Sequence, residues 1–148
     1  MTTSRPRPNN AGKRASDAAR NSLQDQEPCA QHATRGVLRG HVVAAVNILR
    51  SRLAEPWTLD ALADEVHLSR SQVVRCFDAT VGMSPMAYLR QMRVERMARL
   101  LASTDLSIAE AARSVGWKNQ FHASQCFHAA HGVSPTEYRR RQTAQSVR

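Results

Sequence analysis

The sequence contains three cysteines, almost no lysine and no long apolar run. The cysteines are odd in number and widely spaced, so they do not form the framework of a disulfide-rich secreted domain. No apolar stretch approaches the ~20 residues of a membrane-spanning helix. Residues 1–36 are basic but lack the apolar region of a secretory signal. These absences favour a protein of the reducing cytoplasm without a membrane partner.

Arginine supplies nearly all of the positive charge, and lysine is scarce. Only Lys13 and Lys118 are lysines among 21 basic residues, against 12 acidic ones, which gives a formal net charge of +9. The planar guanidinium donates two parallel hydrogen bonds and suits phosphate and guanine. The excess indicates a polyanionic partner such as nucleic acid. An arginine-rich proteome with an ordinary soluble surface is the alternative.

Catalytic and metal-binding patterns are also missing. There is no phosphate loop and no nucleophile elbow, and isolated Ser, His and Asp residues are explained by helix caps and turns. His122 and Cys126 are four residues apart, but they lack the further ligands of a zinc site, as does the Cys29-x-x-His32 pair. The sequence therefore predicts a protein that is not an enzyme and that has no cofactor and no metal.

The chain contains an internal repeat. Residues 76–88 return as residues 126–138, with Cys, Phe, Ala, Gly, Ser, Pro and Tyr in register. Upstream, Leu59, Ala63 and Val66 match Ile108, Ala112 and Val115. Two copies are too few for a solenoid, which needs about three. They suit a protein that makes one kind of contact twice.

Apolar periodicity and capping residues predict an all-α fold of about seven helices, since no segment shows the alternation of a β-strand. The capped helix starts are Thr58, Ser69 with Gln72, Ser84, Ser107 with Glu110, Asn119 and Ser134. Residues 1–36 carry too little apolar surface to fold and are expected to be a disordered basic tail.

Each copy of the repeat has the spacing of a helix-turn-helix motif. Small Ala63 precedes the turn residue His67 by four positions, and Ala112 precedes Gly116 by four. An apolar residue follows each turn by six or seven positions and holds the second helix in place. Two such motifs in a basic, all-helical chain predict a protein that binds double-stranded DNA.

The motifs define the expected domain organisation. A first helix-turn-helix subdomain occupies residues 37–83, a linking helix residues 84–102, a second subdomain residues 103–141 and a disordered tail residues 142–148. A linking helix of about 18 residues spans about 27 Å. With its flanking turns it could hold two reading helices about one DNA turn, ~34 Å, apart. A monomer could then occupy two successive major grooves of an asymmetric site.

Residues 37–141 resemble the DNA-binding domain of the AraC/XylS transcription regulators. The resemblance is carried by Leu62-Ala63, Ser69, Arg75-x-Phe77, Gly82, Ser84-Pro85, Tyr88-Leu89, Arg93, Leu100-Leu101, Ile108, Ala112, Gly116-Trp117, Phe127, Gly132, Pro135 and Tyr138-Arg139. It implies a regulator, expected to be an activator that contacts RNA polymerase and acts at the cytoplasmic nucleoid. The 36 residues ahead leave no room for the family's ligand-binding domain. The chain therefore looks like stand-alone members of the MarA and SoxS kind, which act as monomers.

The expected base contacts lie on the outward positions of the two reading helices. On the first helix, Arg75 is the best candidate for a bidentate contact with guanine, with a phosphate contact or a pair with Asp78 as the alternatives. Gln72 could read adenine, although its capping role competes. The full set of base candidates is Ser71, Gln72, Val74 and Arg75 on the first helix and, by resemblance, Gln120, Phe121, His122, Ser124 and Gln125 on the second.

Phosphate contacts are expected at helix N-termini and nearby donors, namely Ser69, Arg70, Ser84, Lys118 and Asn119.

Other polar and sulfur-containing residues have structural explanations. Arg93 is expected to be structural, and Arg90, Arg96 and Arg99 to form a solvated face. Cys76 and Cys126 are expected to be small apolar filler in the core.

The second subdomain departs from the family pattern. Gln125 replaces a usual Arg, Ala123 a usual Phe, Ala111 a usual Ile or Leu, and Met97 a usual Ala. Phe121 replaces a polar residue, and two orientations are open to it. It could pack on a thymine methyl, or it could turn inward with Trp117 and Met97 to refill the core.

Three other functions are weighed against the regulator. The chain could be a DNA-bending accessory protein of a mobile element, or a regulator whose second reading helix is degenerate. A DNA-processing enzyme is disfavoured because no acidic or metal-binding cluster is present in the sequence.

Overall fold

A computed structural model describes residues 27–148, with side-chain environments from residue 33 onward. This part of the chain forms seven α-helices and no strand, so the predicted all-α class is confirmed. Leu38–Arg148 forms one compact unit, which carries both helix-turn-helix motifs.

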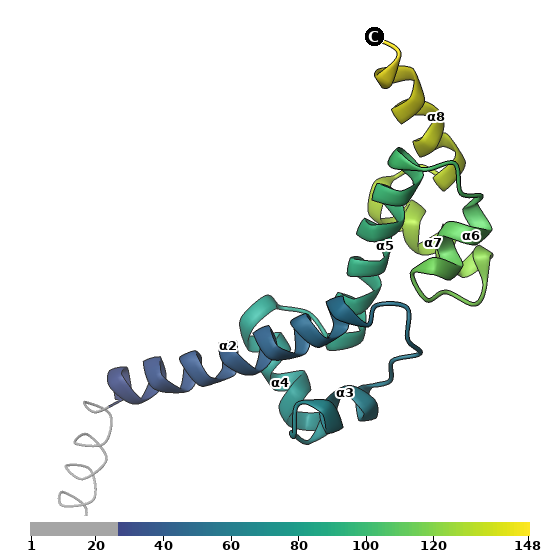
Figure 1. Ribbon diagram of the computed structural model, residues 1–148. Coiled ribbons are helices and arrows are strands. Elements are labelled where there is room, and N and C mark those ends of the chain that lie inside the picture. The colour runs from purple at the N-terminus through teal and green to yellow at the C-terminus, as the bar shows by residue number, and fades with distance from the viewer. Residues whose placement is uncertain (1–26) are drawn as a thin grey trace, which may run out of the picture. The chain divides into compact units, whose positions relative to one another are not determined.

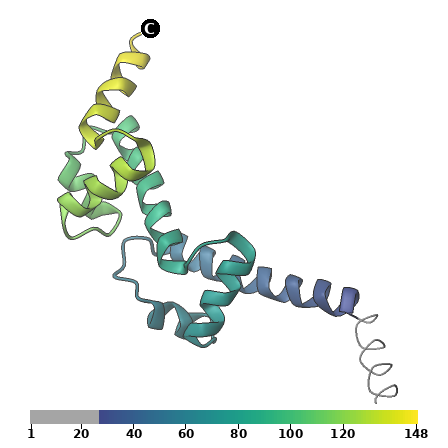
Figure 2. The same cartoon turned by 180° about the vertical axis from the view of Figure 1, so that it is seen from behind.

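The helices are α2 (Glu27–Ser51), α3 (Leu59–Glu65), α4 (Arg70–Val81), α5 (Pro85–Ser103), α6 (Ile108–Ser114), α7 (Gln120–His131) and α8 (Pro135–Ser146). Helix α5 is the linking helix. Opposite views show α4 beside its first half and α6, α7 and α8 beside its second half, while α3 packs against α4 (Figures 1 and 2). The two predicted helix-turn-helix units are therefore α3–α4 and α6–α7.

Both ends of the helical region differ from the predicted boundaries. Helix α2 already includes Glu27, the first residue that the structure describes, so residues 27–36 of the expected disordered tail are helical. Helix α8 continues to Ser146, past the predicted end at residue 141. Its first turns are supported by ion pairs from Glu137 to Arg140 at 2.8 Å and to Arg141 at 2.9 Å. These pairs also lower the pKa of Glu137, and the bond to Arg140 is the larger cause. Residues 1–26 of the expected basic tail lie outside the described residues.

The predicted helix caps are confirmed. In the capping box of α4, the Ser69 N–H donates to Gln72 Oε1 at 2.9 Å and the Gln72 N–H donates to Ser69 Oγ at 3.2 Å. Ser107 and Glu110 form the same box on α6. There the Ser107 N–H bonded to the carboxylate lowers the pKa of Glu110. The helix starts thus follow from short local patterns.

The two subdomains have separate apolar cores, and Leu53 packs against both. Each core holds one copy of a repeated ring pair. Phe77 and Tyr88 meet edge to face at 5.8 Å between centroids, and Phe127 and Tyr138 meet edge to face at 5.3 Å. The first core contains Val42, Ala45, Leu49, Leu62, Ala63, Val73, Cys76, Phe77 and Leu89. The second core contains Val94, Met97, Ala98, Leu101, Ala111, Ala112, Val115, Trp117, Ala123 and Phe127.

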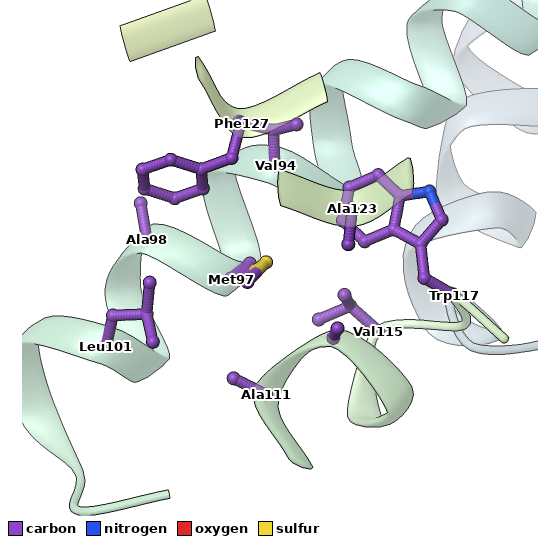
Figure 3. Packing of buried hydrophobic residues seen from close by; sticks show 10 residues of the cluster. Val94, Met97, Ala98, Leu101, Ala111, Val115, Trp117, Ala123 and Phe127 are labelled. Carbon is purple, nitrogen blue, oxygen red and sulfur yellow. The ribbon is translucent and has the colours of Figure 1, made fainter. Parts of the chain in front are cut away.

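The second core is filled without Phe121. Met97 is fully buried in the middle of this cluster, with Ala111, Val115 and Ala123 around it (Figure 3). Phe121 is 82% exposed. The inward orientation considered for Phe121 is therefore wrong, because Met97 and Trp117 already occupy the space that smaller residues leave.

Candidate nucleic-acid interface

The two helix-turn-helix turns have the same construction. In the first, the Leu68 N–H donates to the Ala63 carbonyl at 3.0 Å, and in the second the Trp117 N–H donates to the Ala112 carbonyl at 3.0 Å. The turn residues have positive φ, +55° at His67 and +100° at Gly116. The unusual backbone expected at both positions is present, and it directs α4 and α7 away from α3 and α6.

Helix α4 presents a polar outer face. Val73, Cys76 and Phe77 are buried, whereas the base candidates Ser71, Gln72, Val74 and Arg75 are exposed. Within the described chain, Arg75 forms no ion pair, so the considered pair with Asp78 is not present. The guanidinium is therefore unpaired and able to meet a base edge or a phosphate.

The phosphate candidates near α4 lie at helix starts. Ser69 caps α4, and Ser84 caps α5 by accepting a 3.2 Å hydrogen bond from the Ala87 N–H. Arg70 forms an exposed ion pair with Asp60 of α3 at 3.2 Å. Exposed pairs contribute little stability, so a phosphate can replace this carboxylate at small cost.

Helix α7 presents a face of different chemistry. Gln120, Phe121, His122 and Gln125 are exposed, whereas Ser124 is half-buried. Asn119 caps the helix by accepting a 2.8 Å hydrogen bond from the Phe121 N–H, and Lys118 beside it is exposed. In the register of the repeat, Gln125 takes the place of Arg75. The second reading face therefore lacks the guanidinium of the first.

Two arginines that contact backbone carbonyls tie the helices together. Arg93 Nε donates to the Leu53 carbonyl at 3.1 Å and Arg93 Nη2 to the Glu55 carbonyl at 2.6 Å, as expected for a structural residue. Burial lowers the pKa of the Arg93 guanidinium. Arg139 donates to the carbonyls of Leu101 and Leu106. The sequence predicts no role for Arg139, because helical periodicity does not reveal contacts with Leu101 and Leu106, which lie more than thirty positions away.

From residue 33 onward, the remaining sulfur and imidazole groups form no further site. Cys76 is buried in the first core, and Cys126 is half-buried beside the second. Both are free thiols, as expected for apolar filler. Among the side chains from residue 33 onward, no group of three or more His, Cys, Asp or Glu is placed to hold a metal ion. No helix between residues 27 and 148 has the length and apolar character needed to cross a membrane.

Two similar helix-turn-helix units on one linking helix define a tandem helix-turn-helix domain. A family model described as a helix-turn-helix domain matches residues 62–141. The chain belongs to the AraC/XylS family of transcription regulators, as the DNA-binding domain of that family.

Known relatives support this assignment. A putative AraC-like transcription regulator of Streptomyces lividans is 36% identical over 118 residues, which are 77% of this chain and 39% of the relative. The regulator MtrA of Neisseria gonorrhoeae is 33% identical over 68% of this chain and 33% of its own length. The chain thus spans about two fifths or less of these two curated relatives.

Solved structures match over most of their length. An AraC-type regulator of Chromobacterium violaceum has a TM-score of 0.67 at 27% identity, over 70% of this chain and 93% of that one. The DNA-binding domain of AdpA, solved with a target DNA, has a TM-score of 0.66 at 29% identity. That match covers 68% of this chain and 91% of the AdpA chain.

Proposed function

We propose that this chain binds an asymmetric site in double-stranded DNA as a monomer and regulates transcription as an activator. In this proposal, α4 and α7 enter two successive major grooves. The observation that carries it is the presence of two reading helices with different exposed faces, held in equivalent motifs on one linking helix. The similar AdpA domain, solved with a target DNA, supports a DNA partner.

The asymmetry of the site follows from the chemistry of the two faces. Arg75 on α4 suits a guanine edge, which offers two acceptors in the major groove. At the corresponding position, Gln125 on α7 suits adenine instead. Because the two halves of the protein would read different bases, one copy does not need a palindromic site.

Activation requires a second contact, which we propose is with RNA polymerase. A relative from Pectobacterium atrosepticum, the transcriptional activator RhaR, is 34% identical over 65% of this chain. An activator of this kind works at the nucleoid in the cytoplasm, and it acts by binding rather than by catalysis. The exposed cationic surface and the net charge of +9 suit that location.

Selection of bound duplexes from a random library, followed by hydroxyl-radical footprinting, tests the proposal. We expect one asymmetric sequence with two protected segments about one DNA turn apart on one face. Protection of a single segment would favour a regulator with a degenerate second reading helix. This hypothesis is the main alternative, because α7 carries no arginine. Genomic sites at the ends of mobile elements, rather than at promoters, would favour the DNA-bending accessory protein.

Replacing Arg75 with Ala tests the base contact on α4. We expect binding to the selected site to weaken by about 1–3 kcal/mol and the preference at one base pair to relax, because a bidentate contact to guanine is lost. Fluorescence anisotropy on duplexes carrying each base at that position measures both effects. An equal loss on every sequence would make Arg75 a phosphate contact instead.

Phe121 offers a test on α7, since its ring is 82% exposed and free to pack on a thymine methyl. We expect deoxyuridine, which lacks only that methyl, to weaken binding when it replaces one thymine of the second half-site. A loss of about 1 kcal/mol matches one buried methyl group. The Phe121→Ala variant should bind the thymine and deoxyuridine duplexes equally. If the wild type is indifferent to every such replacement, Phe121 does not read thymine.

A further inference from the structure

The two subdomains meet at a junction formed by Leu53, Ala54, Glu55, Arg93 and Gly116. Arg93 lies on α5, and its guanidinium bonds two carbonyls of the segment between α2 and α3, at 3.1 Å to Leu53 and 2.6 Å to Glu55. Leu53 in turn packs against both apolar cores. The segment that follows α2 is therefore fixed to the linking helix and to both subdomains.

Gly116 brings the turn of the second helix-turn-helix motif into the same junction. A Cβ at this position would lie 2.8 Å from Arg93 Nη2 and 2.9 Å from the Ala54 carbonyl oxygen. The corresponding turn of the first motif carries His67, whose side chain is exposed. Glycine at residue 116 is thus needed for the positive φ and also for a close approach between the two subdomains.

Arg93 is suited to fix geometry as well as to add stability. Its planar fork holds two carbonyl groups in a defined relative position, which a lysine with a single ammonium group cannot do. The guanidinium is half-buried, and an unmade bond to either carbonyl would leave its donors poorly solvated. Breaking the bonds from Arg93 to the two carbonyls is therefore unfavourable. The turn that leads into α7 lies directly against Arg93 and Ala54 at Gly116.

We infer that Arg93 and Gly116 set the orientation of α7 relative to α4 and thereby the half-site spacing that the protein accepts. This inference rests on the proposed function, because it requires both helices to bind one DNA molecule. One added base pair shifts a half-site by about 3.4 Å and rotates it by about 36° around the DNA axis. A rigid junction cannot follow that rotation, whereas a loosened junction can.

The experiment measures affinity for duplexes in which the spacing between the selected half-sites is lengthened or shortened by one and two base pairs. For the wild type, we expect a change of one base pair to weaken binding about tenfold or more, the scale of a lost base contact. For Arg93→Met and Gly116→Ala, we expect the neighbouring spacings to fall within about threefold of the best one. Affinity for a duplex with only the first half-site should stay at the wild-type value.

Two matched controls isolate the junction. Gly132→Ala also introduces a side chain at a positive φ, of +72°, but a Cβ there has no neighbour within 4 Å. Arg99→Met removes a charge from the same linking helix at an exposed position. Both controls should keep the steep spacing preference. Arg93→Lys, which retains the charge but not the fork, should flatten it, and it replaces Arg93→Met if thermal unfolding shows that variant to be unfolded.

The possible results separate the inference from the proposed function. Junction variants that keep the wild-type preference, or controls that flatten it equally, would overturn the inference while leaving two-groove binding intact. A wild-type protein that binds one half-site as tightly as the complete site would overturn the proposed function, and the inference with it.

Discussion

Raising the monovalent salt concentration from 50 to 200 mM is expected to weaken specific DNA binding by about a thousandfold. Each phosphate neutralised by the protein releases counterions and contributes about −0.9 to the slope of log affinity against log salt. If about six phosphates are engaged, the slope is about −5, and a fourfold change in salt then gives the stated loss. The net charge of +9 and the exposed Arg70 and Lys118 near helix starts make this number of contacts attainable.

The slope is measured by anisotropy titrations of the selected duplex and of a scrambled duplex across this salt range. Arg70→Gln should reduce the magnitude of the slope by about 1, because it removes one phosphate contact. Arg140→Gln serves as the control, since that residue lies on α8 and pairs with Glu137 at 2.8 Å. A flat salt response would contradict a nucleic-acid partner altogether.

The helix starts and turns could be predicted because they depend on residues close together in the sequence. Ser69 and Gln72 recognise each other within one helical turn, and Gly82 ends α4 in the left-handed conformation that glycine favours. The same pattern occurs twice in the sequence, so each helix-turn-helix motif supports the prediction of the other. Local chemistry was sufficient for these elements.

The helix ends and the junction depended on information that local patterns do not contain. Helix α8 continues past residue 141 because no breaker follows, although its sequence lacks an apolar face. Arg93 was recognised as structural, but its partners Leu53 and Glu55 lie about forty positions away, and helical periodicity does not reveal them. The same applies to Gly116, which the sequence marks as a turn but not as a contact.

For the candidate interface, the sequence identified outward positions, and the structure distinguished among their environments. Arg75 and Phe121 are exposed, whereas Ser124, on the same helix as Phe121, is half-buried. The orientation of Phe121 could not be decided from the sequence, because it depended on whether other side chains already filled the core. In the structure, the Met97 side chain fills this part of the second core, so Phe121 stays outside it.

Met97→Ala is expected to lower the free energy of unfolding by about 3 kcal/mol, within the range of about 2–5 for such truncations. Met97 is fully buried and occupies the space beside Ala111 and Ala123, two small side chains of the same core. Removing its side chain leaves a cavity that these alanines cannot fill. Urea denaturation followed by circular dichroism measures the loss. Met92→Ala, at a half-buried position on the same helix, should cost less.

A compensating substitution tests whether Met97 and Ala111 share one volume. Ala111→Leu alone should destabilise the protein by about 1–3 kcal/mol, because the core is already full. Combined with Met97→Ala, the added leucine would occupy the vacated space, and the double variant should lie within about 1.5 kcal/mol of the wild type. The two effects would then be strongly non-additive, as expected for residues in contact. If the two losses in unfolding free energy simply add, Met97 and Ala111 do not share one volume. The pairing of a large residue on α5 with a small residue on α6 would then not explain why this core is packed without Phe121.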